Sequence, residues 1–262
     1  MKRFVATVLF VSLAAVLATA QNGTPSSKAT AAINTAVYCN VSNWTSIGDP
    51  VMTCHDIFGG TPVEPTADHF VPIMAMTAKL SNSQSLFVTP SLVTGLYTNT
   101  KVRTSTGSSS SATASGGVFL RAVLYDSGGN PIIAEPIKSC DSSILGCYAD
   151  VNGNKGVVLD SRVQTLTQDL TNCVVNVVVG GVAGSGTCDF TLTTQLILQT
   201  TSAHSFGFIF PNVGVGVYTL SIEASLDSSA FGSGSATAVG GAAFGLGSVT
   251  AESVRLVHGF SF

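Results

Sequence analysis

Charged residues are scarce in this chain. They make up only 10% of the 262 residues, with 11 Lys and Arg against 14 Asp and Glu. A nucleic-acid-binding protein needs clustered Lys and Arg to neutralise phosphates, and a chain with a net charge of −3 lacks that excess. Disordered chains combine high charge with low hydrophobicity, whereas 45% of these residues are hydrophobic. The composition therefore argues against a nucleic-acid partner and predicts a folded chain.

Long apolar runs are also few. One extends from Phe4 to Leu17, after Lys2 and Arg3 and before the small residues 18–20. This order is typical of a secretory signal, and the run is shorter than the roughly 20 residues of a spanning helix. We expect a signal peptide over 1–20, cleavage before Gln21 and a secreted, extracellular product without transmembrane insertion. The C-terminal stretch VRLVHGFSF lacks the apolar tail of a lipid-anchored precursor.

Six cysteines follow the signal, and an even count in a secreted chain predicts disulfide bonds. They fall into three separated pairs whose partners are 15, 7 and 15 positions apart, so we expect local pairing, although six cysteines allow 15 connectivities. A zinc site is the alternative, but the C-x-x-C spacing is absent. The expected bonds are Cys39–Cys54, Cys140–Cys147 and Cys173–Cys188.

From about residue 69 the sequence has the pattern of strands separated by Gly, Pro, Asn and Ser turns. Residues 217–225 alternate apolar and polar side chains, the period of a half-buried strand. The fold class that we predict is all-β: a disulfide-stabilised antiparallel β-sandwich of jelly-roll or Ig-like type, over 69–262. Residues 21–68 are expected to form a polar tail and an irregular, disulfide-tied segment. Further strands are expected at 70–79, 85–97, 117–125, 156–166, 204–210, 235–244 and 248–258.

Two stretches leave alternatives. The low-complexity run over 104–117 predicts either a linker between two domains or a long loop between strands 85–103 and 117–125, which we favour because neither half has a complete core of its own. Residues 189–201 have the Leu192–Leu196 spacing of a helix and the β-branched content of a strand, and we favour a strand.

No catalytic motif is complete. The four histidines are scattered without H-x-H or H-E-x-x-H spacing, and no G-x-S-x-G turn occurs. The DSG triplet at Asp126 resembles the turn of aspartic proteases, which needs a second such carboxylate; a hairpin turn is the simpler interpretation. A hydrolase whose site assembles only in the fold would draw on Asp126, His204 and His258.

One calcium motif is partial. Asp150, Asn152 and Asn154 alternate as in a calcium loop, but Lys155 stands where the loop needs Gly, and Ser161 where it needs Glu. An Asn-Gly hairpin turn explains the same residues. If calcium binds, we expect these three residues and Asp160 as ligands; otherwise no cofactor is expected.

Aromatic residues and sequons define the remaining candidate sites. A carbohydrate-binding surface needs exposed rings, and Trp44 with Tyr38 and Tyr97 is the candidate platform. Three N-glycosylation sequons, at Asn22, Asn40 and Asn43, predict a glycoprotein if the host is eukaryotic.

The valine- and glycine-rich stretch over 172–188 is too short and too interrupted to span a membrane. It predicts either a hairpin with a buried face, clamped by Cys173 and Cys188, or an exposed apolar recognition loop.

Together these features predict a secreted, non-catalytic β-sandwich glycoprotein. We expect it to act by surface contact with an extracellular protein or polysaccharide, in a cell wall, a matrix or facing a host, and to self-associate as a homo-oligomer. A carbohydrate-binding module centred on Trp44 and a secreted hydrolase are the alternatives.

Overall fold

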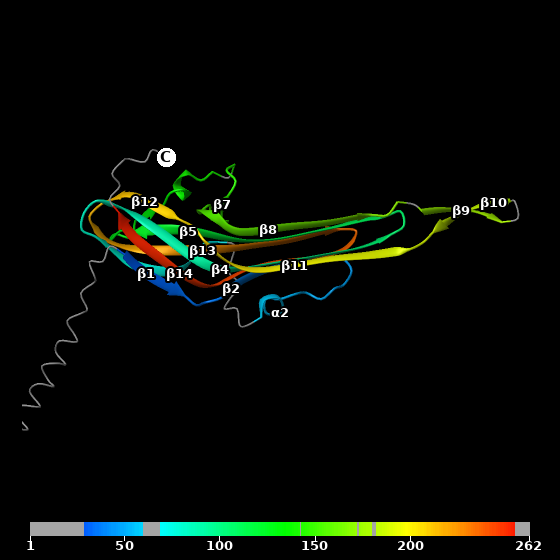
Figure 1. Cartoon of the computed structure of the whole chain (residues 1–262), viewed down its shortest axis with the longest axis horizontal. Coiled ribbons are helices and arrows are strands. Elements are labelled where there is room, and N and C mark those ends of the chain that lie inside the picture. Colours follow the sequence, from blue (N-terminus) through cyan, green and yellow to red (C-terminus); the bar gives the residue numbers. More distant parts are fainter. Residues whose placement is uncertain (1–28, 60–68, 142, 172, 180–181, 255–262) are drawn as a thin grey trace, which may run out of the picture.

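The computed structural model describes residues 29–59, 69–141, 143–171, 173–179 and 182–254. Its elements are almost all strands in an elongated arrangement (Figure 1). They are β1 (Ala29–Asn34), β2 (Tyr38–Thr45), α2 (Cys54–Phe58), β3 (Val71–Leu80), β4 (Gln84–Ser105), β5 (Ser109–Tyr125), β6 (Pro131–Ile133), the 3₁₀ turn η1 (Ile137–Ser139), β7 (Cys147–Ala149), β8 (Lys155–Asp169), β9 (Cys173–Val179), β10 (Val182–Cys188), β11 (Thr191–Ser205), β12 (Phe208–Val213), β13 (Gly216–Ser233) and β14 (Ser235–Val254).

Two six-stranded antiparallel sheets pack face to face, which confirms the predicted disulfide-stabilised β-sandwich. Sheet A has the order β1-β14-β4-β11, with β2 on β14 and β12 on β4. Sheet B has the order β3-β13-β5-β8-β7, with β6 on β5. Strands β9 and β10 pair only with each other among the described residues and form a separate hairpin at one end of the molecule (Figure 1).

The main core lies between the sheets where both are rich in large apolar residues. Strand β13 contributes Leu220, Ile222 and Ala224, all fully buried as their alternation predicts. Phe208 and Phe210 enter from β12 and are fully buried. The single strand expected over 204–210 is wrong, because β11 ends at Ser205 and β12 begins at Phe208. We call the part of the sandwich that holds this core cluster, including Leu220, Ile222, Phe208 and Phe210, the wide half.

Beyond the level of Gly116 and Gly240 the sandwich is built differently, and we call residues 98–116, 162–169, 191–198 and 228–240 the narrow half. A Cβ added to Gly240 would lie 2.1 Å from the carbonyl oxygen of Ser115, and one on Gly116 would lie 2.4 Å from that of Gly241. Sheets normally pack about 10 Å apart because side chains fill the space. Here glycine lets two backbones of opposite sheets approach directly.

The interior of the narrow half is lined by small and polar side chains. Its apolar part consists of Val102 and four alanines, at 112, 114, 236 and 238. Beside it, Gln164 of β8 accepts from the Thr98 hydroxyl at 2.8 Å and donates to Thr100 Oγ1 at 2.6 Å, and all three residues are buried. Buried polar groups are tolerated when they are hydrogen-bonded. Hydrogen bonds between the sheets thus replace much of the apolar packing.

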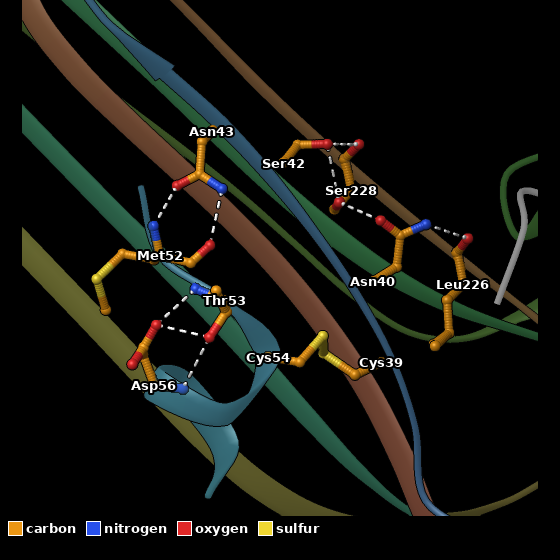
Figure 2. Close-up of a disulfide and its surroundings, with 10 residues drawn as sticks. All are labelled: Cys39, Asn40, Ser42, Asn43, Met52, Thr53, Cys54, Asp56, Leu226 and Ser228. Carbon is orange, nitrogen blue, oxygen red and sulfur yellow. Dashed lines mark hydrogen bonds between the residues drawn. A yellow bond between two sulfur atoms is a disulfide. The ribbon is translucent and has the colours of Figure 1, made fainter. Parts of the chain in front are cut away.

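Two disulfide-tied segments cover the outer faces. The predicted Cys39–Cys54 bond fastens residues 46–59 and α2 onto sheet A (Figure 2). Helix α2 begins with a capping box between Thr53 and Asp56. The predicted Cys140–Cys147 bond ties the segment 126–154, which covers the outer face of sheet B.

The structure corrects two further sequence-based expectations. Residues 38–45, expected to be irregular, form β2, because alternate side chains of this stretch face the other sheet. The low-complexity run over 104–117 is neither a linker nor a long loop: β4 ends at Ser105, β5 begins at Ser109, and small side chains suit the narrow interior. Strand β11, by contrast, confirms the strand expected at 189–201.

Candidate functional site

The three rings of the predicted aromatic platform do not lie together. Tyr97 is 6% exposed and packs beneath α2 on the outer face of sheet A, where burial raises its pKa. Tyr38 faces the opposite way and stacks on Phe244 in the main core. Trp44 packs against the alanine-lined interior and lies directly over Gly232 of β13. The rings therefore close the sandwich and present no shared surface to a sugar.

The residues of the partial calcium motif also do not form one site. Asp150 closes the turn between β7 and β8, where its carboxylate accepts from the backbone N–H groups of Phe70, Asn152 and Asn154. Burial alone would raise the pKa of Asp150, but these bonds and that of the Asn154 amide hold it below its ordinary value. Asp160 lies away from this turn on β8, bonded to Thr94. Among the described residues, no group of three or more His, Cys, Asp or Glu is placed to hold a metal ion.

Asp126 also stabilises a turn. Its carboxylate accepts from Asn130 through side chain and backbone and from the backbone N–H of Gly128, and the Asn130 amide is the main cause of its lowered pKa. The hairpin-turn interpretation of the DSG triplet is therefore correct. His258 lies outside the described residues.

Two of the three sequon asparagines are used inside the fold (Figure 2). The Asn43 amide is bonded twice to the backbone of Met52, at 2.9 Å each way. Asn40 points between the sheets, donating to the Leu226 carbonyl and accepting from Ser228. Ser42 also reaches Ser228. These polar side chains of β2 cover the edge of β13. Asn22 lies outside the described residues.

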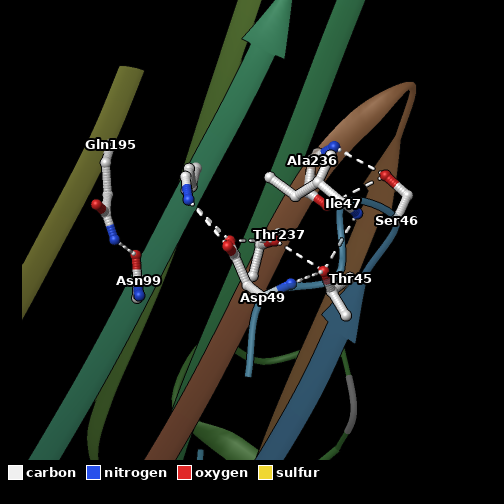
Figure 3. A network of polar contacts seen from close by, with 9 residues as sticks. Thr45, Ser46, Ile47, Asp49, Asn99, Gln195, Ala236 and Thr237 are labelled. Carbon is white, nitrogen blue, oxygen red and sulfur yellow. Dashed lines mark hydrogen bonds and ion pairs between the residues drawn. The ribbon is translucent and has the colours of Figure 1, made fainter. Parts of the chain in front are cut away.

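A polar network binds the loop after β2 to the outer face of sheet A (Figure 3). Asp49 forms an ion pair with Lys101 at 2.9 Å and accepts from Thr237 at 2.8 Å. The Lys101 ammonium is the main cause that lowers the pKa of Asp49, and the Thr237 hydroxyl adds to it. The network anchors a loop, and both Asp49 carboxylate oxygens accept hydrogen bonds from the same chain.

A hollow of about 330 Å³ beside the cover of sheet B is lined by three of the seven Lys and Arg residues in the described ranges: Arg121, Lys138 and Lys155. Arg121 is paired with the buried Glu223, its Nε donating at 2.6 Å, and lies over the Phe70 ring. Lys155 donates to the carbonyl of Cys140 at 2.6 Å. Lys155 therefore holds the segment 126–154 in place, and a ligand anion would have to compete with Glu223 for Arg121.

The fold places Ser202 and Asp160 beside His204, and the spacing of histidines in the sequence did not predict the contact with Asp160. Its Nε2 lies 2.6 Å from Ser202 Oγ and 3.3 Å from Asp160 Oδ2, which joins β11 of sheet A to β8 of sheet B. In a serine triad the nucleophile and the carboxylate contact different ring nitrogens. Here both contact the same nitrogen, so the cluster is built as a bridge between sheets.

Strand β11, one of the two edge strands of sheet A, is exposed along most of its length. Leu192, Leu196, Ile197 and Leu198 are 42–52% exposed, on both faces of the strand. Its 15 residues contain no Lys, Arg, Asp or Glu. Natural edge strands are usually short, charged or covered because a bare edge pairs with other strands. Sequence reasoning treated this stretch only as an ambiguous element; its lack of charge was the signal of an exposed, unprotected edge.

The hairpin of β9 and β10 lies beyond the narrow half, between β8 and β11 in the chain (Figure 1). Its register places Cys173 opposite Cys188 and Val178 opposite Ala183. The predicted hairpin is confirmed in backbone. The burial of its valines and the Cys173–Cys188 bond concern side chains outside the described part and stay predictions.

No protein-family model and no curated protein matches this chain. Solved structures of infectious bursal disease virus are similar to it at a low level. The Gx strain structure has 11% identity and a TM-score of 0.17 over 87% of this chain and 40% of that one; the VP2 subviral particle has 13% and 0.14 over 87% and 42%. The chain spans about two fifths of their length, and TM-scores this low support no argument. No helix in the described ranges is long and apolar enough to cross a membrane.

Proposed function

We propose that this protein is a secreted, non-catalytic glycoprotein that works by surface contact, and that β11 is its contact element. The observation that carries the proposal is the exposure of β11: a long, uncharged edge with leucine and isoleucine on both faces. An edge strand of this kind offers main-chain hydrogen bonds as well as apolar side chains to a partner.

The other candidate sites support this choice by the uses that their residues already have. Asp126 and Asp150 close turns, Trp44 closes the sandwich, and His204 bridges the sheets. The polar groups of these residues bind other parts of the same chain. The exposed leucine and isoleucine side chains of β11, in contrast, belong to none of the buried hydrophobic clusters of the described residues.

Secretion is proposed on the leader over 1–20 and on the two disulfides, which persist in oxidising compartments. Expression of the full chain in a secreting eukaryotic host should release a protein that begins at Gln21. Glycan mapping should find Asn40 unoccupied, since its amide faces β13. Retention of the whole chain in cells would contradict the secretory part.

The contact function is tested with fluorescent mature protein on cellulose, chitin, immobilised collagen and the immobilised protein itself. We expect retention on at least one of these surfaces, strongly reduced by Ile197→Lys on β11. The matched control is Ile33→Lys, at an exposed isoleucine on β1, the opposite edge strand of the same sheet. Equal retention of both variants, or no retention of the wild type on any surface, would contradict the proposal.

A further inference from the structure

The sequence of β11 reads the same in both directions about its centre. Residues 193–201 are TTQLILQTT, a palindrome centred on Ile197. In an antiparallel pair of two identical strands related by a two-fold axis at Ile197, each residue meets its own kind: Leu196 meets Leu198, Gln195 meets Gln199, and Thr meets Thr on either side. In a two-fold interface one patch must serve as both halves of the contact, and a palindromic strand meets this condition with like-for-like pairs.

We propose that the partner of β11 is a second copy of this chain, paired antiparallel about Ile197 so that two A sheets join into one. The inference rests on the proposed contact function and adds the identity of the partner. Cross-strand pairs of equal size and polarity are favourable units of sheet pairing.

The outer edge of β11 has no strand neighbour among the described residues, but beside its centre the Leu196 carbonyl accepts from the Gln164 side chain of β8, so a second copy has to share or displace that bond. Strand β11 pairs only with β4 among the described strands, over all 15 residues, and Ile197 is 52% exposed. No Lys, Arg, Asp or Glu lies on β11, so two copies bring no like charges together there. The edge of β13, in contrast, is covered by the side chains of Asn40 and Ser42.

Side chains of β8 reach β11 at the same level. Gln164 of β8 donates to the Leu196 carbonyl, and Arg162 donates to Thr200. Val163, between these two residues in sequence, points to the opposite face of β8, away from β11, and is 73% exposed.

The oligomeric state is measured by sedimentation as the concentration of mature protein is raised. We expect the wild type and Ile33→Lys to reach twice the monomer mass, and Ile197→Lys to remain monomeric with unchanged circular dichroism. A wild type that stays monomeric, or an Ile197→Lys variant that dimerises like the wild type, overturns the proposal. If the protein is monomeric yet adheres to a foreign surface through Ile197, this inference fails while the contact function stands.

The register is tested by oxidative cross-linking. Opposed residues of an antiparallel pair have Cα atoms about 4.5 or 5.5 Å apart, and both separations suit a disulfide. Ile197→Cys should therefore cross-link with itself. Gln195→Cys alone should not, but it should cross-link when mixed with Gln199→Cys. A dimer in which Gln195→Cys links to itself would contradict the two-fold axis at Ile197.

Discussion

Arg121 and Glu223 show how a charged pair can serve as a core contact. Both are shielded beneath the segment 126–154, with side chains 13% and 4% exposed, and the Tyr125 hydroxyl donates to the second carboxylate oxygen at 3.1 Å. Burial, followed by the neighbouring Glu223 charge, raises the pKa of Tyr125. The pair is shared between neighbouring strands, since Glu223 of β13 stands opposite Arg121 of β5.

Removal of one partner should be costly. Arg121→Met leaves Glu223 buried without its cation, and losses of about 3–5 kcal/mol are typical of a broken buried pair. Denaturant unfolding of Arg121→Met should show a loss of this size, and the double variant with Glu223→Leu should recover part of it. A single variant as stable as the wild type would show that the pair is screened by solvent.

Asp49 should make the loop after β2 sensitive to acid. Its pKa lies below the ordinary value of 3.8 in the folded protein, because of the Lys101 ammonium first and the Thr237 hydroxyl second. The carboxylate form is thus favoured by folding. Its stabilising contribution is present above pH 3.8 and is lost as the pH falls through the folded pKa.

The measurement compares wild type and Asp49→Asn in thermal unfolding from neutral pH into acid. We expect a constant difference in stability above about pH 4 and convergence of the two proteins below it. A difference that grows in acid would contradict the assigned role.

At the scale of single elements, the glycines decide how closely the sheets approach. Gly240→Ala places a methyl group against the carbonyl oxygens of Ser115 and Ser229, at 2.1 and 2.4 Å without relaxation. Overpacking of an interior commonly costs about 1–3 kcal/mol. We expect a loss of at least this size in chemical unfolding. Gly207→Ala is the control, because a Cβ there has nothing within 4 Å; equal stability of the two variants would count against the close approach.

The alternation in β13 predicted its inner face, but it could not predict that Glu223 and Ser225 on the other face are buried too. The partners of Glu223 are Arg121 and Tyr125 of β5, which are 102 and 98 residues away in the chain. The same reason hid the pairing of Thr98 with Gln164, 66 residues apart. Periodicity reports which side of a strand is apolar, whereas the second layer over a sheet depends on contacts that a local pattern does not encode.

Candidate sites were harder to predict for a related reason. Trp44 and the sequon asparagines have side chains that sequence reasoning assigns to ligands or glycans, yet β2 lies at an edge where such groups close the sandwich. Local spacing did identify the Cys39–Cys54 and Cys140–Cys147 bonds, because those partners are close in sequence. Exposure of β11 depends on the strand order, which spacing does not supply.

For the whole molecule, the two halves should differ in local stability. Few large apolar side chains are buried in the narrow half, and regions of this kind open at lower free energy than a dense core. Native-state hydrogen exchange should therefore give lower opening free energies for amides of residues 98–104 than for residues 86–96 of the same strand, β4. Equal values along β4 would mean that the sandwich opens as one unit.

The buried hydrogen bonds of Gln164 with Thr98 and Thr100 also affect how the stability of the narrow half depends on temperature. Exposure of apolar surface raises the heat capacity on unfolding, while exposure of polar surface lowers it. In the narrow half the two contributions oppose each other, so its opening should involve a small heat-capacity change per residue. The stability of the narrow half should then vary less steeply with temperature than that of the wide half. The narrow half should therefore resist cold better than its modest apolar core suggests.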